Sequence, residues 1–146
     1  MGARVTVELL LDNSAFARLG SVALQQDRAN DIADALEQRQ LGVCLPFLLE
    51  AGYSARNATD HDELLCELMA LPILHIDAEV ERRAIAAQHQ LARSGHHRIP
   101  PVDLIVASVA DRHGVGVLHY DHDYDTIAAK TDLRFASVWL AQRGDL

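Results

Sequence analysis

The stretch VTVELLLDNS, residues 5–14, predicts a first strand that is followed directly by Asp12. Residues 5–11 form an apolar run interrupted by Glu8, and this run has the length of one strand, far short of the roughly 20 apolar residues of a membrane span. The tripeptide DNS follows at once, so the run also lacks the longer apolar core and the cleavage site of a secretory signal. We therefore expect a first strand that ends at Asp12, in a cytoplasmic protein without a membrane segment.

Short apolar runs alternate with longer amphipathic stretches along the rest of the chain, which is typical of an α/β fold with a mainly parallel sheet. Thr59 and Asp77 have the side chains of helix N-caps, and Pro101 suits a first helical turn. Further strands are expected over residues 41–45, 73–76, 115–120 and 135–140. Helices are expected over residues 27–40, 46–55, 59–71, 78–93, 101–113 and 125–130.

The composition is that of one folded domain spanning residues 1–146, with 49% hydrophobic and 23% charged residues. The chain has 13 basic and 21 acidic residues, for a net charge of −8. This charge argues against broad adhesion to nucleic acid or to an anionic membrane, so any contact with nucleic acid has to be local. Cys44 and Cys66 lack the spacing of a redox or metal motif and are interpreted as buried thiols.

Four acidic residues lie among apolar neighbours, where a carboxylate is costly unless something compensates it. Asp12 and Asp121 each end an apolar strand, and ligands of open α/β sheets bind at the carboxyl ends of strands. Asp103 lies in the first turn of an apolar helix, and Glu50 lies on the helix that follows the second expected strand. We expect these four carboxylates to meet in one crevice and to act as the catalytic residues.

Four carboxylates at close range repel one another, and the usual remedies are raised pKa values or a bound divalent cation, of which we favour the cation. Oxygen ligands suit Mg²⁺ or Mn²⁺ rather than Zn²⁺, so we expect Asp12, Asp103 and Asp121 to bind one of these metals. Such sites usually act on phosphate esters, because the ion activates water and neutralises the phosphate.

The run DHDYD, residues 121–125, resembles the start of an EF-hand calcium loop, but its continuation does not fit. The sixth position is Thr126 instead of glycine, and the twelfth is Asp132 instead of glutamate. We therefore expect Asp123 or Asp125 to be an auxiliary acidic ligand, with the other acid capping the next helix. The eight histidines lack a cysteine pair with zinc spacing and are interpreted mainly as solvated side chains.

In their order and spacing, four segments resemble a PIN-domain ribonuclease of the VapC toxin family: LLLDNS at residues 9–14, LEA at 49–51, PVDLIVA at 101–107 and LHYDHDY at 118–124. The resemblance covers almost the whole chain. It implies a three-layer α/β/α sandwich around a mainly parallel sheet of four or five strands. It also implies that the four acids above form the family's acidic quartet.

The same resemblance implies an activity and partners. It implies Mg²⁺- or Mn²⁺-dependent cleavage of structured RNA, such as tRNA or ribosomal RNA, which inhibits translation. It further implies a homodimer that a VapB-type antitoxin neutralises. Ser14 matches the family's hydroxyl residue after the first aspartate, whereas His119 stands where the family often has Thr or Ser before the fourth acid. We expect Ser14 and His119 to supply supporting hydrogen bonds.

Two alternatives stay open at this point. A haloacid-dehalogenase-like phosphohydrolase would have a second acid at position 14 and a lysine before its last acids. This chain has Ser14 there, and its single lysine, Lys130, comes after those acids, which also disfavours a response-regulator receiver. A PIN-like binding module without catalysis is the other alternative, and a metal-dependent cleavage assay separates it from the enzyme.

Overall fold

The computed structural model describes residues 6–146 and forms a parallel four-stranded sheet in the order β2-β1-β3-β4. Leu10 pairs with Gly42 on one side and with Val117 on the other, so β1 lies inside the sheet. The fold is α/β with a parallel sheet, as the sequence predicts. The strands are β1 (Leu9–Leu11), β2 (Leu41–Gly42), β3 (Gly116–His119) and β4 (Ser137–Trp139).

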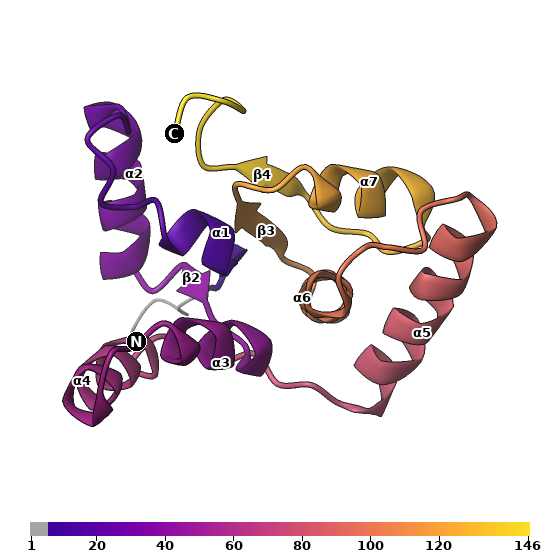
Figure 1. The fold of residues 1–146 in the computed structure, drawn as a ribbon, viewed down its shortest axis with the longest axis horizontal. Helices are drawn as coiled ribbons and strands as arrows, with labels where there is room; N and C mark the ends of the chain where they lie inside the picture. The colour runs from indigo at the N-terminus through magenta and orange to yellow at the C-terminus, as the bar shows by residue number, and fades with distance from the viewer. Residues whose placement is uncertain (1–5) are drawn as a thin grey trace.

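Helices surround the sheet: α3 lies next to β2 with α4 packed on it, α6 lies next to β3, and α7 lies next to β4 (Figure 1). Helix α6 packs on β1 and β3, and the strand order β2-β1-β3-β4 requires crossover connections between parallel strands. Both features agree with the expected α/β/α sandwich. None of the helices within residues 6–146 is long and apolar enough to cross a membrane. The helices are α1 (Asn13–Phe16), α2 (Gln26–Glu37), α3 (Leu45–Tyr53), α4 (Ala58–Leu68), α5 (Ala78–Arg93), α6 (Pro101–His113) and α7 (Asp123–Lys130).

Two helices begin directly after a residue whose side chain accepts one of the free N–H groups of the first turn. The Asp77 carboxylate accepts the Val80 N–H at 2.9 Å and caps α5 as predicted. The predicted cap at Thr59 is wrong, because α4 starts earlier. Its cap is Asn57, whose side-chain oxygen accepts the Asp60 N–H at 2.9 Å from extended backbone.

All five expected strands are shorter than predicted: β2 is Leu41–Gly42 instead of residues 41–45, and β3 is Gly116–His119 instead of residues 115–120. Residues 73–76 contribute a single bridge, between Val43 and Ile73, instead of a strand. The last strand covers three of the six expected residues, 137–139. Position 5 of the first expected strand lies outside the described residues, and β1 itself begins at Leu9.

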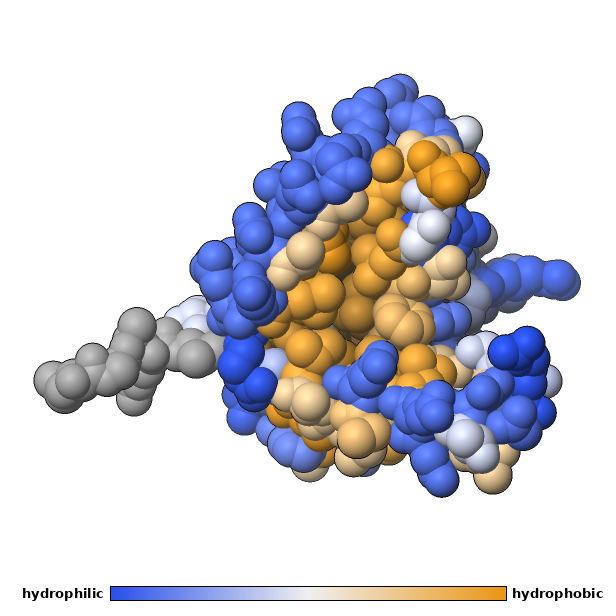
Figure 2. Space-filling model, turned by 90° about the vertical axis from the view of Figure 1, so that its left-hand side faces the viewer, coloured by the Kyte–Doolittle hydropathy of each residue, from blue (hydrophilic) through white to orange (hydrophobic). Residues whose placement is uncertain are grey.

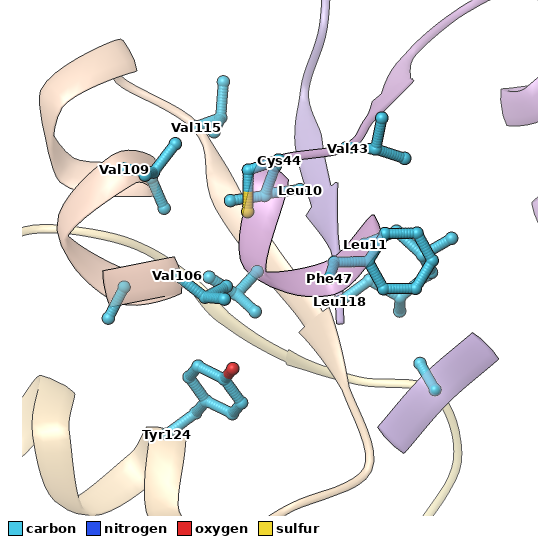
Figure 3. Close-up of a cluster of buried hydrophobic side chains, with 14 of the residues drawn as sticks. Leu10, Leu11, Val43, Cys44, Phe47, Val106, Val109, Val115, Leu118 and Tyr124 are labelled. Atoms are coloured by element: carbon cyan, nitrogen blue, oxygen red, sulfur yellow. The ribbon is translucent and has the colours of Figure 1, made fainter. Parts of the chain in front are cut away.

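Apolar side chains of β1, β3, α3 and α6 form the core (Figure 3). Gly116 permits the close approach of three strands, since a Cβ there would lie 2.8 Å from Leu9 Cδ2 and 2.9 Å from the Ala136 carbonyl oxygen. Cys44 is buried as predicted, but Cys66 is exposed, so that prediction is wrong. Tyr124 lies at the edge of the cluster in Figure 3 and is the labelled side chain there that carries an oxygen.

Candidate active site

The carboxyl ends of β1 and β3 bring the first acids together. Asp12 follows β1 directly, and its N–H donates to the Leu118 carbonyl of β3 at 3.0 Å. Asp103 is the third residue of α6, which packs on both strands. Asp12 and Asp103 are only 5% and 8% exposed, so two acidic side chains are buried at this end of the sheet.

Asp12 is held by hydrogen bonds on both carboxylate oxygens. Oδ2 accepts the Ser14 N–H at 3.0 Å and the Ser14 hydroxyl at 2.5 Å. Oδ1 accepts the hydroxyl of Tyr124 at 2.6 Å. The Ser14 oxygen also accepts the Tyr120 N–H at 2.9 Å, so this hydroxyl connects the ends of β1 and β3. The side chain of Asp12 is therefore fixed in one orientation.

Asp103 is satisfied on one oxygen only. Its Oδ1 lies 3.4 Å from the Tyr124 hydroxyl, whereas its buried Oδ2 has no hydrogen-bond partner within residues 6–146. Buried polar atoms are nearly always paired, so this oxygen is an exception that requires an explanation. One carboxylate oxygen each from Asp103, Asp121 and Asp123 lies within 4.8 Å of the other two.

This arrangement, the three-acid cluster of Asp103, Asp121 and Asp123, fits a divalent cation. Three oxygen donors from carboxylates are the ligands that Mg²⁺ and Mn²⁺ prefer, and a cation would satisfy the unpaired Asp103 oxygen. The cluster contains Asp103 and Asp121 from the expected metal ligands and Asp123 from the expected auxiliary acids. Asp12 is outside the cluster, and its oxygens accept hydrogen bonds from Ser14 and Tyr124.

The acids perturb one another. Burial, followed by the charges of Asp12 and Asp121, raises the pKa of Asp103 to about 7. Burial and the charge of Asp12 raise the pKa of Glu50 above its ordinary value, and burial and the charge of Asp121 do the same for Asp123. Without a cation the site therefore favours a proton on Asp103 near neutral pH.

Glu50 is placed on the wall of the site by α3. It lines a cavity of about 580 Å³ with Asn13, which follows Asp12, and with Val102, which precedes Asp103. The charge of Asp12 acts on Glu50, but Glu50 is not part of the three-acid cluster. It is thus positioned beside the proposed ligands rather than among them.

A family match and two curated relatives indicate the same protein family. The PIN domain family matches residues 9–130. The chain is 40% identical over 115 residues to Ribonuclease VapC18 of Mycobacterium tuberculosis, covering 77% of this chain and 82% of that protein. It is 38% identical over 128 residues to Ribonuclease VapC51 of the same organism, covering 87% and 90%. The chain belongs to the VapC family of PIN-domain proteins.

Solved structures share the fold. A DNA-bound VapBC from Salmonella typhimurium superposes with a TM-score of 0.69 at 16% identity, covering 93% of this chain and 100% of that one. VapBC-5 from Mycobacterium tuberculosis gives a TM-score of 0.61 at 21% identity, covering 90% and 99%. The parallel sheet and its helices are therefore those of VapC structures.

His119, expected to supply supporting hydrogen bonds, contacts the backbone of Asp121 and the side chain of Ser137. Its ring is fully buried, with Nδ1 accepting the Asp121 N–H at 3.1 Å and Nε2 lying 2.7 Å from the Ser137 hydroxyl oxygen. Because Nδ1 accepts, this network assigns the proton to Nε2, which donates to Ser137. The Ser137 hydroxyl in turn donates to Asp125 at 2.6 Å. His119 thus fixes the backbone of Asp121.

Asp125 lies outside the three-acid cluster of this VapC-family site. Its two carboxylate oxygens accept hydrogen bonds from Ser137 and from Trp139 Nε1, at 2.6 and 2.9 Å. These contacts tie α7 to β4. Of the two auxiliary acids expected from the sequence, Asp123 is the one that the structure places beside Asp103 and Asp121.

Sequence reasoning missed Tyr124. This side chain is fully buried, and its hydroxyl lies between the carboxylates of Asp12 and Asp103. Burial raises its pKa well above the ordinary value, so the hydroxyl remains a donor. A large aromatic residue three positions after Asp121, on the first turn of a short helix, is the signal that could have indicated an inward-facing group.

Proposed function

We propose that the protein is a ribonuclease toxin of a toxin–antitoxin module that hydrolyses structured RNA, such as tRNA or ribosomal RNA, with Mg²⁺ or Mn²⁺ and so inhibits translation in the cytoplasm. The observation that carries this proposal is the unpaired buried oxygen of Asp103 beside Asp121 and Asp123, in a chain of the VapC family. The relatives VapC18 and VapC51 are named ribonucleases, which supports the reaction.

In this proposal Asp103, Asp121 and Asp123 hold the metal ion. When bound, the ion supplies positive charge for the phosphate and lowers the pKa of water. Asp12 is oriented by Ser14 and Tyr124 and adds negative charge beside Asp103. The raised pKa of Glu50 makes its carboxylate a better base than an ordinary glutamate, so we assign to it the proton of the attacking water.

The hydrolysis adds a water oxygen to phosphorus and breaks the bond to one ribose oxygen, which takes up a proton. This reaction requires at least one group that accepts a proton and one charge that stabilises the departing oxygen. Glu50 would accept a proton from the water, which balances the proton that the departing oxygen takes up, and a cation held by the three-acid cluster would supply the positive charge. His119 is buried and hydrogen-bonded and takes neither role.

An apolar hollow on the face of α2, α3 and α4, bordered by hydrophilic residues, supports an antitoxin partner (Figure 2). Exposed apolar surface of this kind usually marks a protein interface. Several structural neighbours are VapBC complexes, so we assign the hollow to an apolar segment of a VapB-type antitoxin. The net charge of −8 suits a basic partner.

A second apolar surface supports the homodimer. Leu45, Leu49 and Tyr53 repeat every four residues on α3 and are 55%, 64% and 93% exposed. They continue into Val102 and Ile105 of α6 around the same cavity as Glu50. We assign this stripe to contact with a second copy, because a two-fold dimer pairs one such stripe with itself.

Cleavage of RNA by antitoxin-free protein tests the proposal. Wild type and the Asp121→Asn variant are incubated with total tRNA and ribosomal RNA, with Mn²⁺, Mg²⁺ or EDTA. We expect discrete fragments only when wild type is incubated with a metal. The control variant Asp62→Asn, an exposed substitution on α4 with the same charge change, is expected to cleave as wild type does. If folded wild type binds Mn²⁺ but cuts no RNA, the binding-module alternative is the better one.

A further inference from the structure

A second cavity lies beside the three-acid cluster, between α7 and the chain that follows β4. Its volume is about 800 Å³, within the range of ligand-binding pockets. His122, which lies between Asp121 and Asp123 in the chain, lines this cavity, so the cavity and the cluster share the segment before α7. We call it the α7 groove and define it by His122, Lys130, Trp139 and Arg143.

The outer wall of the α7 groove is fixed to the cluster by Tyr120, the residue before Asp121. The Tyr120 hydroxyl oxygen accepts the N–H groups of Gly144 and Leu146 at 2.8 and 2.9 Å. Gly144 has a φ of +92°, a left-handed conformation that suits glycine and turns the chain back. The segment that carries Arg143 is therefore held in place.

The floor of the groove is an aromatic ring that cannot rotate freely. Trp139 is half-buried, and its Nε1–H donates to Asp125 at 2.9 Å. Its ring meets those of His119 and Tyr120 edge to face, at centroid distances of 5.0 and 5.6 Å. A rigid, partly exposed aromatic ring is the kind of surface on which a nucleobase stacks.

The charge of the groove differs from that of the whole chain. Lys130 and Arg143 are exposed, and within residues 6–146 neither takes part in an ion pair. The acid that lines the groove, Asp125, has both oxygens bonded to β4. A protein with a net charge of −8 thus presents, in one groove, two cations without an ion pair in the described part of the chain.

We propose that the α7 groove binds a single-stranded segment of RNA adjacent to the phosphate that is cleaved. Lys130 and Arg143 contact backbone phosphates, and Trp139 stacks on a base. The proposal rests on the proposed ribonuclease function and names a part of the substrate path. RNA is favoured over a peptide because two exposed cations and one aromatic ring line the same groove, which matches the phosphates and bases of a strand. Single strands also expose their bases for stacking.

Binding of a fluorescein-labelled, twelve-nucleotide single-stranded RNA of mixed sequence, followed by anisotropy in EDTA, tests the groove without cleavage. The variant is Lys130→Ala with Arg143→Ala, and the matched control is Arg56→Ala with Arg82→Ala, which removes two exposed arginines elsewhere. We expect the groove variant to weaken binding on the order of ten-fold and to reduce the salt slope by about 1.4, which is about 0.7 for each lost phosphate contact. The control should retain the wild-type slope.

Trp139→Leu and Trp139→Phe test the stacking separately. We expect the leucine variant to lose affinity and the phenylalanine variant to keep most of it, with circular dichroism showing both folded. Equal losses in the groove and control double variants would overturn the proposal, and so would undetectable binding by wild type. If wild type cleaves RNA and the groove variant binds and cleaves identically, the groove proposal is overturned and the ribonuclease function is supported. If wild type binds RNA through the groove but cleaves none, the groove proposal is supported and the ribonuclease function is overturned.

Discussion

Replacing Asp103 with asparagine is expected to stabilise the metal-free protein while removing its metal site. The folded protein holds the pKa of Asp103 at about 7, against an ordinary value of 3.8, because the carboxylate is buried among other acids. The native state therefore binds this proton more tightly than the unfolded chain does. Stability is greatest below the unfolded pKa and falls as pH rises through the folded pKa, since ionisation costs more in the native state.

The size of this effect follows from the shift. A difference of about 3 pKa units corresponds to ~4 kcal/mol of unfolding free energy once the pH exceeds both values, at about 1.36 kcal/mol per unit. Relaxation and water entry reduce this figure, so we expect a gain of about 2–4 kcal/mol for Asp103→Asn near pH 8 and about 2 kcal/mol less near pH 5. The asparagine amide can also donate to the neighbouring carboxylates.

Urea unfolding in EDTA near pH 5 and near pH 8 measures both gains, with Asp62→Asn on α4 as the control. The control is expected to stay within about 0.5 kcal/mol of wild type at both pH values. Adding Mn²⁺ at about 100 times its Kd should then stabilise wild type by ~2.7 kcal/mol and leave Asp103→Asn unchanged. If Asp103→Asn is no more stable than wild type near pH 8, or is stabilised equally at both pH values, the raised pKa of the buried Asp103 carboxylate is refuted as the cause.

Three further predictions concern neighbouring groups. Tyr124→Phe removes the donor to Asp12, and we expect a loss of about 1–3 kcal/mol in unfolding free energy near neutral pH, measured in urea, because a buried carboxylate oxygen loses its partner. Ser137→Ala breaks the link between His119 and Asp125; Mn²⁺ affinity by calorimetry should fall several-fold with the fold retained, and an unchanged affinity would contradict the positioning of Asp121 by His119. Leu49→Asp on the exposed stripe of α3 should convert the dimer to monomer in sedimentation velocity, whereas an unchanged mass would exclude this stripe as the interface.

The fold class could be predicted from the sequence because the patterns that indicate its strands and helices lie within short segments. Alternation of short apolar runs with amphipathic stretches requires no knowledge of distant contacts, and the caps at Asp77 and the start at Pro101 depend on neighbouring residues. The prediction failed at residues 73–76, where an apolar run forms one bridge to Val43, because strand length depends on which partner backbone is available. Thr59 failed as a cap because Asn57 offered an acceptor two residues earlier.

Local sequence signals were enough to place acids after β1 and β3 and in the first turn of α6, since strand ends and first helical turns are properties of short segments. Tertiary packing fixed which of these carboxylates come within 4.8 Å of one another. Tyr124 and Ser14 bond the oxygens of Asp12, while α7 turns Asp123 toward Asp103 and Asp125 toward β4. Residues two apart on a helix point in nearly opposite directions, because 3.6 residues make one turn, and only packing fixes which of them faces the sheet.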